Sequence, residues 1–262
     1  TIPRQYNAAY DLLQRNLQAG RADKVAFIDD RGAITYGELD RRSNRLANLL
    51  VDLGVQREQR VLLCAHDTID FPTAFLGAIK AGAVPVAVNT LLTAGDYEYM
   101  LGDCRAPLAV VSAALLPLFE PLVAKLPTLK RLLVSGGAKS DPNALATLLD
   151  KQSDQFHVVE TNADDACFWL YSSGSTGAPK GTVHLHGSLI QTAELYARPI
   201  LGIEERDVVF SAAKLFFAYG LGNGLTFPMA VGATAILMAE RPTPASVFER
   251  LRAHQPTIFY GV

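Results

Sequence analysis

The sequence predicts an α/β fold in which parallel-rich sheets are flanked by helices. Short β-branched runs alternate with helical patterns along the whole chain, and the connections between them are short. That alternation is typical of parallel sheets covered by helices. Of the 262 residues, 49% are hydrophobic and 19% are charged. This is a globular composition in a chain long enough to bury a substantial core.

Local capping patterns predict where helices start in the first half of the chain. Thr35 and Glu38 have the spacing of a capping box, and Thr93 and Asp96 open another short helix. Asp141-Pro142 has the pattern of an N-cap followed by proline at the first helical position. A helix is also expected at residues 71–82, and buried strands are expected at residues 60–65, 84–89, 107–112 and 129–136.

The same alternation continues in the second half. Residues 166–172 and 181–186 predict strands on either side of a loop. Further strands are expected at 207–215, 232–238 and 257–262, and helices at 187–201, 220–231 and 244–254, the first of them interrupted or ended near Pro199. We therefore divide the chain into a first α/β subdomain, residues 1–165, and a second part, residues 166–262. This second part holds the loop strand and the start of a second α/β subdomain.

Bulk properties narrow the class of protein. The formal net charge is −2, from 24 Lys and Arg and 26 Asp and Glu, so nothing in the composition argues for nucleic acid or an anionic membrane as a partner. No apolar run reaches the roughly 18–20 residues of a membrane span. The three cysteines form no CxxC pair and no disulfide framework, which fits a cytoplasmic protein.

The histidines give weaker indications of function than the other motifs. His184 and His186 would share one face of a strand, but a third ligand is not evident. We therefore expect packing, or a role near a nucleotide, rather than a metal site. His66 follows the end of a predicted strand, where loops of α/β proteins often carry function.

The most unusual stretch is the loop SSGSTGAPKG, residues 172–181. Its glycines allow successive backbone N–H groups to point at one spot, its hydroxyls add donors, and Lys180 adds a compact positive charge. Between two strands, this combination favours a polyphosphate ligand over a solvated linker turn. The pattern GxxxxGK followed by Ser or Thr is not met, because the sixth residue from Gly174 is Pro179 and Gly181 follows the lysine. A GTPase-type or kinase-type phosphate loop is therefore disfavoured.

The loop closely resembles the signature of the adenylate-forming superfamily, which includes acyl-CoA synthetases and other AMP-binding enzymes. Residues 172–181 meet every position of that signature, from its Ser/Thr-rich start to the final Pro-Lys-Gly. Residues 34–50 and 77–93 resemble two further segments of the family, so the resemblance covers most of the chain. Residues 214–225 resemble the benzoate–CoA ligases and their aryl relatives.

The resemblance implies the large N-terminal domain of such an enzyme, in a layered α/β/α/β/α arrangement that is incomplete here. It implies activation of a carboxylate with ATP and Mg²⁺ to an acyl-adenylate, with release of pyrophosphate, and then transfer to the thiol of coenzyme A. The adenine, ribose and Mg²⁺ ligands and the C-terminal domain would follow Val262. No metal ligand is therefore assigned in this chain, and we expect the fragment alone to be inactive. Thr176 and Lys180 would be catalytic, and the phosphate-binding residues would be Ser172, Ser173, Gly174, Ser175, Thr176, Gly177 and Lys180.

The residues that would bind the acid follow a predicted strand. In the family this segment lines the acyl pocket, and no acidic residue occurs from Lys214 to Pro228 to pair with a substrate ammonium. Aromatic walls and a small gap suit a planar ring, so we expect a benzoate-like acid without an α-amino group. The alternative is that Phe216 and Phe217 are core residues, because two adjacent side chains cannot share one face of a strand. The expected substrate-binding residues are Phe217, Ala218, Tyr219, Gly220 and Tyr260.

The sequence thus favours an AMP-forming aryl acid–CoA ligase of aromatic catabolism. Its partners would be an aryl carboxylate, ATP, coenzyme A and the missing C-terminal part of the same enzyme. Two alternatives stay open: an aryl-acid adenylation domain that loads a carrier protein, and a non-catalytic nucleotide-binding fragment. The loop does not separate them, because all three would share it. A homodimer is also left open.

Overall fold

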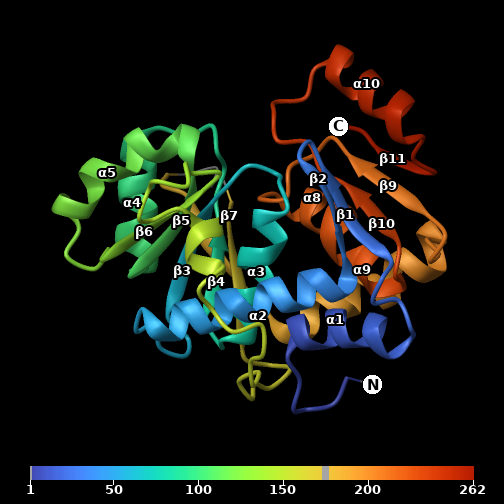
Figure 1. The fold of residues 1–262 in the computed structure, drawn as a ribbon, viewed down its shortest axis with the longest axis horizontal. Helices are drawn as coiled ribbons and strands as arrows, with labels where there is room; N and C mark the ends of the chain where they lie inside the picture. Colours follow the sequence, from blue (N-terminus) through green and yellow to red (C-terminus); the bar gives the residue numbers. More distant parts are fainter. Residues whose placement is uncertain (1, 173–176) are drawn as a thin grey trace.

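Two mostly parallel sheets form the frame of the molecule. The computed structural model describes residues 2–172 and 177–262 (Figure 1). Among those residues the first sheet has the strand order β6-β5-β3-β4-β7-β8 and the second has the order β11-β9-β10-β1-β2. Neighbouring strands are parallel except for the pairs β7–β8 and β1–β2, which are antiparallel. The strands are β1 (Val25–Asp29), β2 (Gly32–Thr35), β3 (Arg60–Cys64), β4 (Val84–Ala87), β5 (Leu108–Ser112), β6 (Arg131–Ser135), β7 (Ala166–Ser172), β8 (Lys180–Leu185), β9 (Val208–Ser211), β10 (Thr234–Ile236) and β11 (Ile258–Tyr260).

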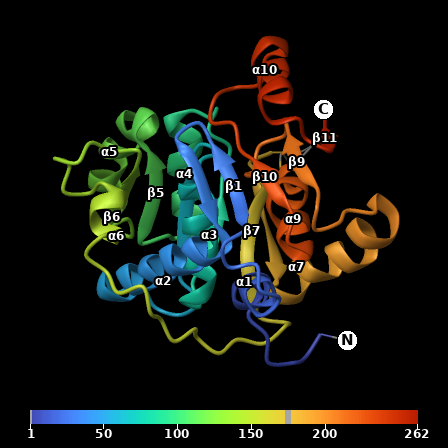
Figure 2. The same cartoon turned by 45° about the vertical axis from the view of Figure 1, so that its right-hand side comes forward.

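Helices lie between the sheets and on their outer faces. Figures 1 and 2 show α4 and α5 with the first sheet on one side of the molecule, and α10 with the second sheet on the other. The helices are α1 (Ala8–Gln18), α2 (Tyr36–Asp52), α3 (Asp70–Lys80), α4 (Ala94–Cys104), α5 (Leu116–Lys125), α6 (Leu145–Leu149), α7 (His186–Thr192), α8 (Ala218–Leu221), α9 (Phe227–Val231) and α10 (Pro244–His254), with a short 3₁₀ turn η1 (Ala113–Leu115) and the π-helical segments η2 (Ala193–Leu201) and η3 (Gly222–Thr226).

Buried apolar side chains of the described residues fall into clusters that define the layers. The largest cluster joins Phe75 of α3 to Phe27 in the second sheet and Leu63 in the first, and every residue of α3 is buried. A second cluster packs Phe119 of α5 against the other face of the first sheet. A third packs Phe210 of β9 against residues of α10. The order helix, sheet, helix, sheet, helix confirms the layered α/β/α/β/α arrangement expected from the sequence.

The two predicted capping boxes form at the starts of α2 and α4. The Thr35 hydroxyl accepts a hydrogen bond from the Glu38 N–H at 3.2 Å, and the Glu38 carboxylate accepts one from the Thr35 N–H at 2.9 Å. The same reciprocal pair forms between Thr93 and Asp96 at the start of α4. These bonds satisfy N–H groups that a helix start leaves without partners, so the predicted capping boxes are confirmed.

The predicted helix start at Asp141-Pro142 is wrong. The Asp141 carboxylate accepts a hydrogen bond from the Asn143 N–H at 2.8 Å, which closes a turn instead of capping a helix. Ala144 then makes a bridge with Val134, so the chain is extended there and α6 starts only at Leu145.

The helical run from residue 186 also passes Pro199 and ends at Leu201, followed by Gly202 with a left-handed φ of 70°.

The sheets are not contiguous in sequence. Strands β1 and β2 pair with β10 in the second sheet, while β7 and β8 complete the first. Each sheet therefore takes strands from both sides of residue 165, and the division into residues 1–165 and 166–262 stays a prediction.

In the described ranges, no helix combines the length and the apolar character needed to cross a membrane.

Candidate active site

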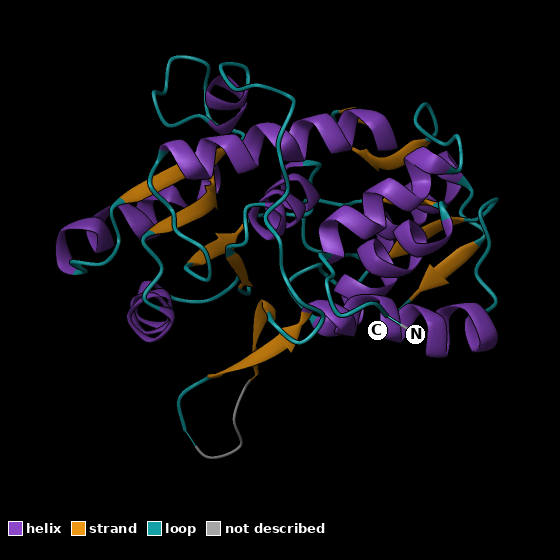
Figure 3. Ribbon diagram, turned by 90° about the horizontal axis from the view of Figure 1, so that it is seen from below, coloured by secondary structure: helices purple, strands orange, loops and turns teal. Residues whose placement is uncertain are grey.

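The predicted phosphate loop joins two antiparallel strands. Figure 3 shows the β7–β8 hairpin projecting from the body of the molecule. Ser172 and Lys180 pair across the base of the loop, and both are exposed. Gly177 is also exposed and has a φ of 150°, a conformation that favours glycine. The other predicted loop residues, Ser173, Gly174, Ser175 and Thr176, lie outside the described residues.

Helix α4 braces the hairpin. The Tyr99 hydroxyl donates a hydrogen bond to the Pro179 carbonyl at 3.1 Å, next to Lys180. The Tyr171 hydroxyl donates to the Asp103 carboxylate at 2.6 Å. Gly181 allows close packing, because a Cβ there would lie 3.0 Å from the Trp169 ring. Several contacts thus steady the strands that carry the loop.

A large apolar cavity lies at the ends of β3, β9 and β10. Its volume is about 1140 Å³, and three predicted acid-binding residues, Phe217, Ala218 and Tyr219, line it. Phe217 and Tyr219 are half exposed, at 49% and 52%. The full set of lining residues is His66, Asn89, Thr90, Leu91, Ala212, Ala213, Lys214, Phe216, Phe217, Ala218, Tyr219, Ala239, Glu240, Arg241, Pro242 and Val262. Aromatic side chains in a concave site can bind a flat apolar ligand.

Both adjacent phenylalanines face this cavity. The strand predicted for residues 207–215 ends at Ser211, and residues 212–217 form bends and turns. Alternation between two faces applies only to an extended strand, so in this segment Phe216 and Phe217 can line the same pocket. Their ring centroids lie 4.5 Å apart. The premise that adjacent side chains cannot share one face is therefore wrong here, but Phe216 is only 5% exposed and also belongs to the largest core cluster, as the core alternative expected.

Gly220 and Tyr260 support the wall instead of lining it. A Cβ on Gly220 would lie 2.0 Å from the Lys214 carbonyl oxygen, so the glycine is required by close backbone packing. Tyr260 is 6% exposed, and its ring stands edge-on to Tyr219 with centroids 6.4 Å apart. Its hydroxyl is buried with no hydrogen-bond partner among the described residues.

Charged groups surround the apolar walls. The Lys214 ammonium donates hydrogen bonds to the carbonyls of Met238 and Glu240, the latter at 2.6 Å. The Glu240 carboxylate, which also lines the cavity, pairs with Arg250 at 3.0 Å. Burial lowers the pKa of His66, and the nearby Lys214 ammonium lowers it further. The position of His66 after a strand end indicates a functional loop from the sequence alone. The approach of Lys214 and Glu240 to the same pocket depends on contacts that no local sequence pattern signals.

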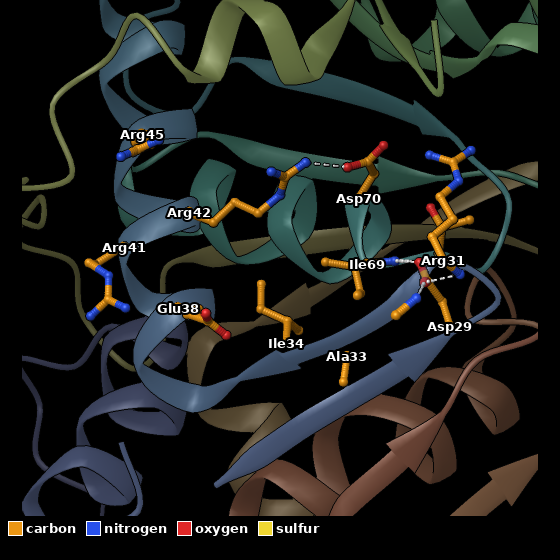
Figure 4. Close-up of a pocket in the computed structure, with 12 residues that line it drawn as sticks. Asp29, Arg31, Ala33, Ile34, Glu38, Arg41, Arg42, Arg45, Ile69 and Asp70 are labelled. Atoms are coloured by element: carbon orange, nitrogen blue, oxygen red, sulfur yellow. Dashed lines mark hydrogen bonds and ion pairs between the residues drawn. The ribbon is translucent and has the colours of Figure 1, made fainter. Parts of the chain in front are cut away.

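A second pocket, of about 520 Å³, is rich in arginine but less suited to a ligand. Arg42 already pairs with Asp70 at 2.6 Å. The Asp29 carboxylate accepts hydrogen bonds from the backbone N–H groups of Arg31 and Ile69. Figure 4 shows Arg41 and Arg45 along α2 at one end, with Arg31 at the other. The guanidinium groups do not converge, so we place the candidate active site at the apolar cavity.

His184 and His186 do not share one face of a strand, because β8 ends at Leu185 and His186 is the first residue of α7. Both side chains are held by packing. The His184 ring stacks on Phe168, with centroids 4.6 Å apart and an interplanar angle of 3°. His186 is buried, and its Nδ1 accepts a hydrogen bond from the Ala8 N–H at 3.1 Å. The described part of the chain holds no group of three or more His, Cys, Asp or Glu side chains placed to bind a metal ion.

Comparison with known proteins identifies the family. A family model described as AMP-binding enzyme matches residues 13–262. The chain belongs to the AMP-binding enzyme family. This membership accords with the resemblance of the loop 172–181 to the adenylate-forming signature.

Several members of the AMP-binding family are similar over the whole chain. A benzoate–CoA ligase of Thauera aromatica is 68% identical over 100% of this chain and 49% of its own length. The crystal structure of a benzoate CoA ligase from Burkholderia xenovorans is 52% identical, with a TM-score of 0.89 over 98% of this chain and 50% of that one. An anthranilate CoA ligase solved in complex with anthranoyl-AMP is 37% identical, with a TM-score of 0.95 over 99% of this chain and 50% of that one. The chain thus spans about half the length of these relatives.

Proposed function

We propose that this chain is the N-terminal half of an AMP-forming aryl acid–CoA ligase that accepts benzoate-like acids. The observation that carries the proposal is the aromatic pocket of Phe216, Phe217 and Tyr219, in a chain that is 68% identical to a benzoate–CoA ligase. For this chain, the acid, ATP and coenzyme A remain proposed substrates.

The proposed reaction has two steps. In the first, a carboxylate oxygen of the acid attacks the α-phosphorus of ATP, and the bond to the bridging oxygen breaks to release pyrophosphate. In the second, the thiol of coenzyme A attacks the acyl carbon, loses its proton, and releases AMP as the leaving group. Donors that stabilise the departing pyrophosphate lower the barrier of the first step.

Each part of the chain has a role in that scheme. We assign the β- and γ-phosphates to the loop from Ser172 to Lys180, with Thr176 and Lys180 as the groups that stabilise the leaving pyrophosphate. The aromatic walls hold the ring of the acid. Mg²⁺ would accompany ATP, and the described residues include no group of three or more His, Cys, Asp or Glu side chains placed to hold a metal ion. No step is therefore assigned to the metal, and its ligands are expected in the other half of the protein.

The charges of the pocket favour an acid without an α-amino group. Glu240 lines the cavity, but it is already paired with Arg250 at 3.0 Å. Lys214 adds a positive charge beside the walls. A substrate ammonium would lose its hydration there without gaining a free carboxylate partner.

A panel of carboxylic acids in ATP–pyrophosphate exchange tests the proposal. The complete protein that contains this chain should exchange pyrophosphate with benzoate and hydroxybenzoates, and far more slowly with alkanoates or phenylalanine. Offering coenzyme A and a carrier protein in parallel then identifies the acceptor. Exchange with none of the aryl acids would reject the proposed substrate class, and transfer only to the carrier protein would favour the adenylation-domain alternative.

Lys180 and Thr176 provide a second test in the same assay. We expect Lys180→Ala and Thr176→Ala to slow exchange by about 10²–10³-fold, the usual cost of removing one donor to a developing charge. Lys151→Ala, which removes an exposed lysine outside the loop, serves as the control. Normal exchange in both loop variants would remove the loop from the mechanism.

A further inference from the structure

One wall of the apolar cavity is built from three chain segments that meet at the ends of parallel strands. Asp67 lies just after β3, Lys214 follows β9, and Glu240 follows β10. Strand β3 belongs to the first sheet, and β9 and β10 are neighbours in the second. Contacts among these segments therefore join the two sheets at the rim of the pocket.

Asp67 holds the start of the aromatic turn. Its side chain is 4% exposed, and its two carboxylate oxygens lie 3.3 and 3.2 Å from the backbone nitrogen of Leu215, which donates to them. Leu215 directly precedes Phe216 and Phe217. A shift of the carboxylate would thus be transmitted to the residues that line the pocket.

Lys214 holds the same turn to the end of β10. Its ammonium donates to the carbonyls of Met238 and Glu240, at the end of β10. The residues from Ala239 to Pro242 also line the cavity. Asp67 and Lys214 thus clamp one segment from two sides, with a carboxylate on its backbone N–H and an ammonium on the neighbouring strand end.

The two charges also support each other. Burial raises the pKa of Asp67 to about 7, and the Lys214 ammonium and the Leu215 N–H oppose that rise. Burial lowers the pKa of Lys214, and the carboxylates of Asp67 and Glu240 oppose that change. Removing either charge takes this favourable interaction away from the other group, which lies in a poorly solvated site. Loss of either charge is therefore expected to weaken the clamp, and loss of the hydrogen-bonding atoms is expected to weaken it further.

We propose that Asp67 and Lys214 are positioning residues that set the width of the aryl-acid pocket, so that they control the affinity for the acid and not for ATP. This inference rests on the ligase activity proposed above. The selectivity follows from the topology, because the proposed phosphate loop is carried by the β7–β8 hairpin and the clamp holds the ends of β3, β9 and β10.

The test measures KM for benzoate and for ATP separately in the complete enzyme. Lys214→Met and Asp67→Ala should each raise KM for benzoate at least about tenfold, with KM for ATP within about twofold of wild type. Asp67→Asn keeps an oxygen that can accept from Leu215 but loses the charge, so we expect a smaller rise of about threefold. Lys80→Met is the control, because it removes a buried lysine that pairs with Asp40 at 2.7 Å and does not line the cavity.

Each outcome decides between a positioning role and a structural one. Unchanged KM for benzoate in both clamp variants overturns the proposal. So does an equal rise in both KM values, or the same rise in benzoate KM for Lys80→Met. If Lys214→Met and Asp67→Ala do not fold, Asp67→Asn decides: a rise in KM for benzoate alone supports the clamp, and a wild-type value overturns it. A wild-type enzyme that never uses benzoate would instead reject the proposed function.

Discussion

Substituting alanine for Gly220 tests whether this glycine is needed for packing behind the pocket. Its added Cβ would lie 2.0 Å from the Lys214 carbonyl oxygen, 2.5 Å from its carbonyl carbon and 2.6 Å from the Ala213 oxygen. Nonbonded heavy atoms without a steric clash lie more than about 3 Å apart, so the turn must move by roughly 1 Å. The obstacles are backbone atoms and cannot change rotamer. We therefore expect a cost near the upper end of overpacking, about 3 kcal/mol.

Two measurements on Gly220→Ala follow from that estimate. The free energy of unfolding in urea should fall by about 3 kcal/mol, and KM for benzoate in the complete enzyme should rise because the turn carries the aromatic wall. Gly102→Ala is the control. That glycine is exposed in α4 with no atom within 4 Å of the new Cβ, so the change should stabilise the protein by about 0.5–1 kcal/mol. A Gly220→Ala enzyme with wild-type stability and wild-type KM would refute the packing argument.

Two further predictions concern buried polar groups away from the pocket. Lys80→Met leaves the Asp40 carboxylate without its partner at 2.7 Å and should cost about 3 kcal/mol in urea unfolding, with both KM values unchanged. Burial lowers the pKa of His186 from 6.5 to about 4, so its contribution to stability is complete above pH 6.5 and is lost as the pH falls towards 4. The stability of wild type relative to His186→Gln should therefore drop by up to about 3 kcal/mol over that range, and a constant difference would contradict the buried, neutral histidine.

Short-range features of the fold could be predicted well. The capping boxes of Thr35 and Thr93 act over three residues, so their spacing alone identifies the helix starts. The strands on either side of the loop also follow from local patterns, and β7 spans the predicted residues 166–172. The start at Asp141 failed because the same side chain can close a turn or cap a helix. Only the bridge from Ala144 to Val134 decides between the two.

Elements with distant partners were harder to predict. The hairpin β1–β2 and helix α1 were not anticipated from the sequence. The register of β1 is set by pairing Phe27 with Ala235, more than two hundred residues later. The aromatic segment is a candidate pocket wall from its sequence, but the strand before it was expected to reach Leu215 and ends at Ser211. Its bends and turns place Phe216 and Phe217 on one cavity, which residue types alone do not indicate.

By itself, the sequence determined the α/β class, the loop of glycines, hydroxyls and Lys180, and the aromatic character of residues 216–219. Each of these depends on residues close together in the chain, where backbone preferences and spacing suffice. Only the tertiary structure brought Lys214 to carbonyls 24 and 26 residues away, and Asp67 to a backbone nitrogen 148 residues away. Such contacts form where strand ends of two sheets meet, and no periodicity along the chain encodes which side chains will share that space.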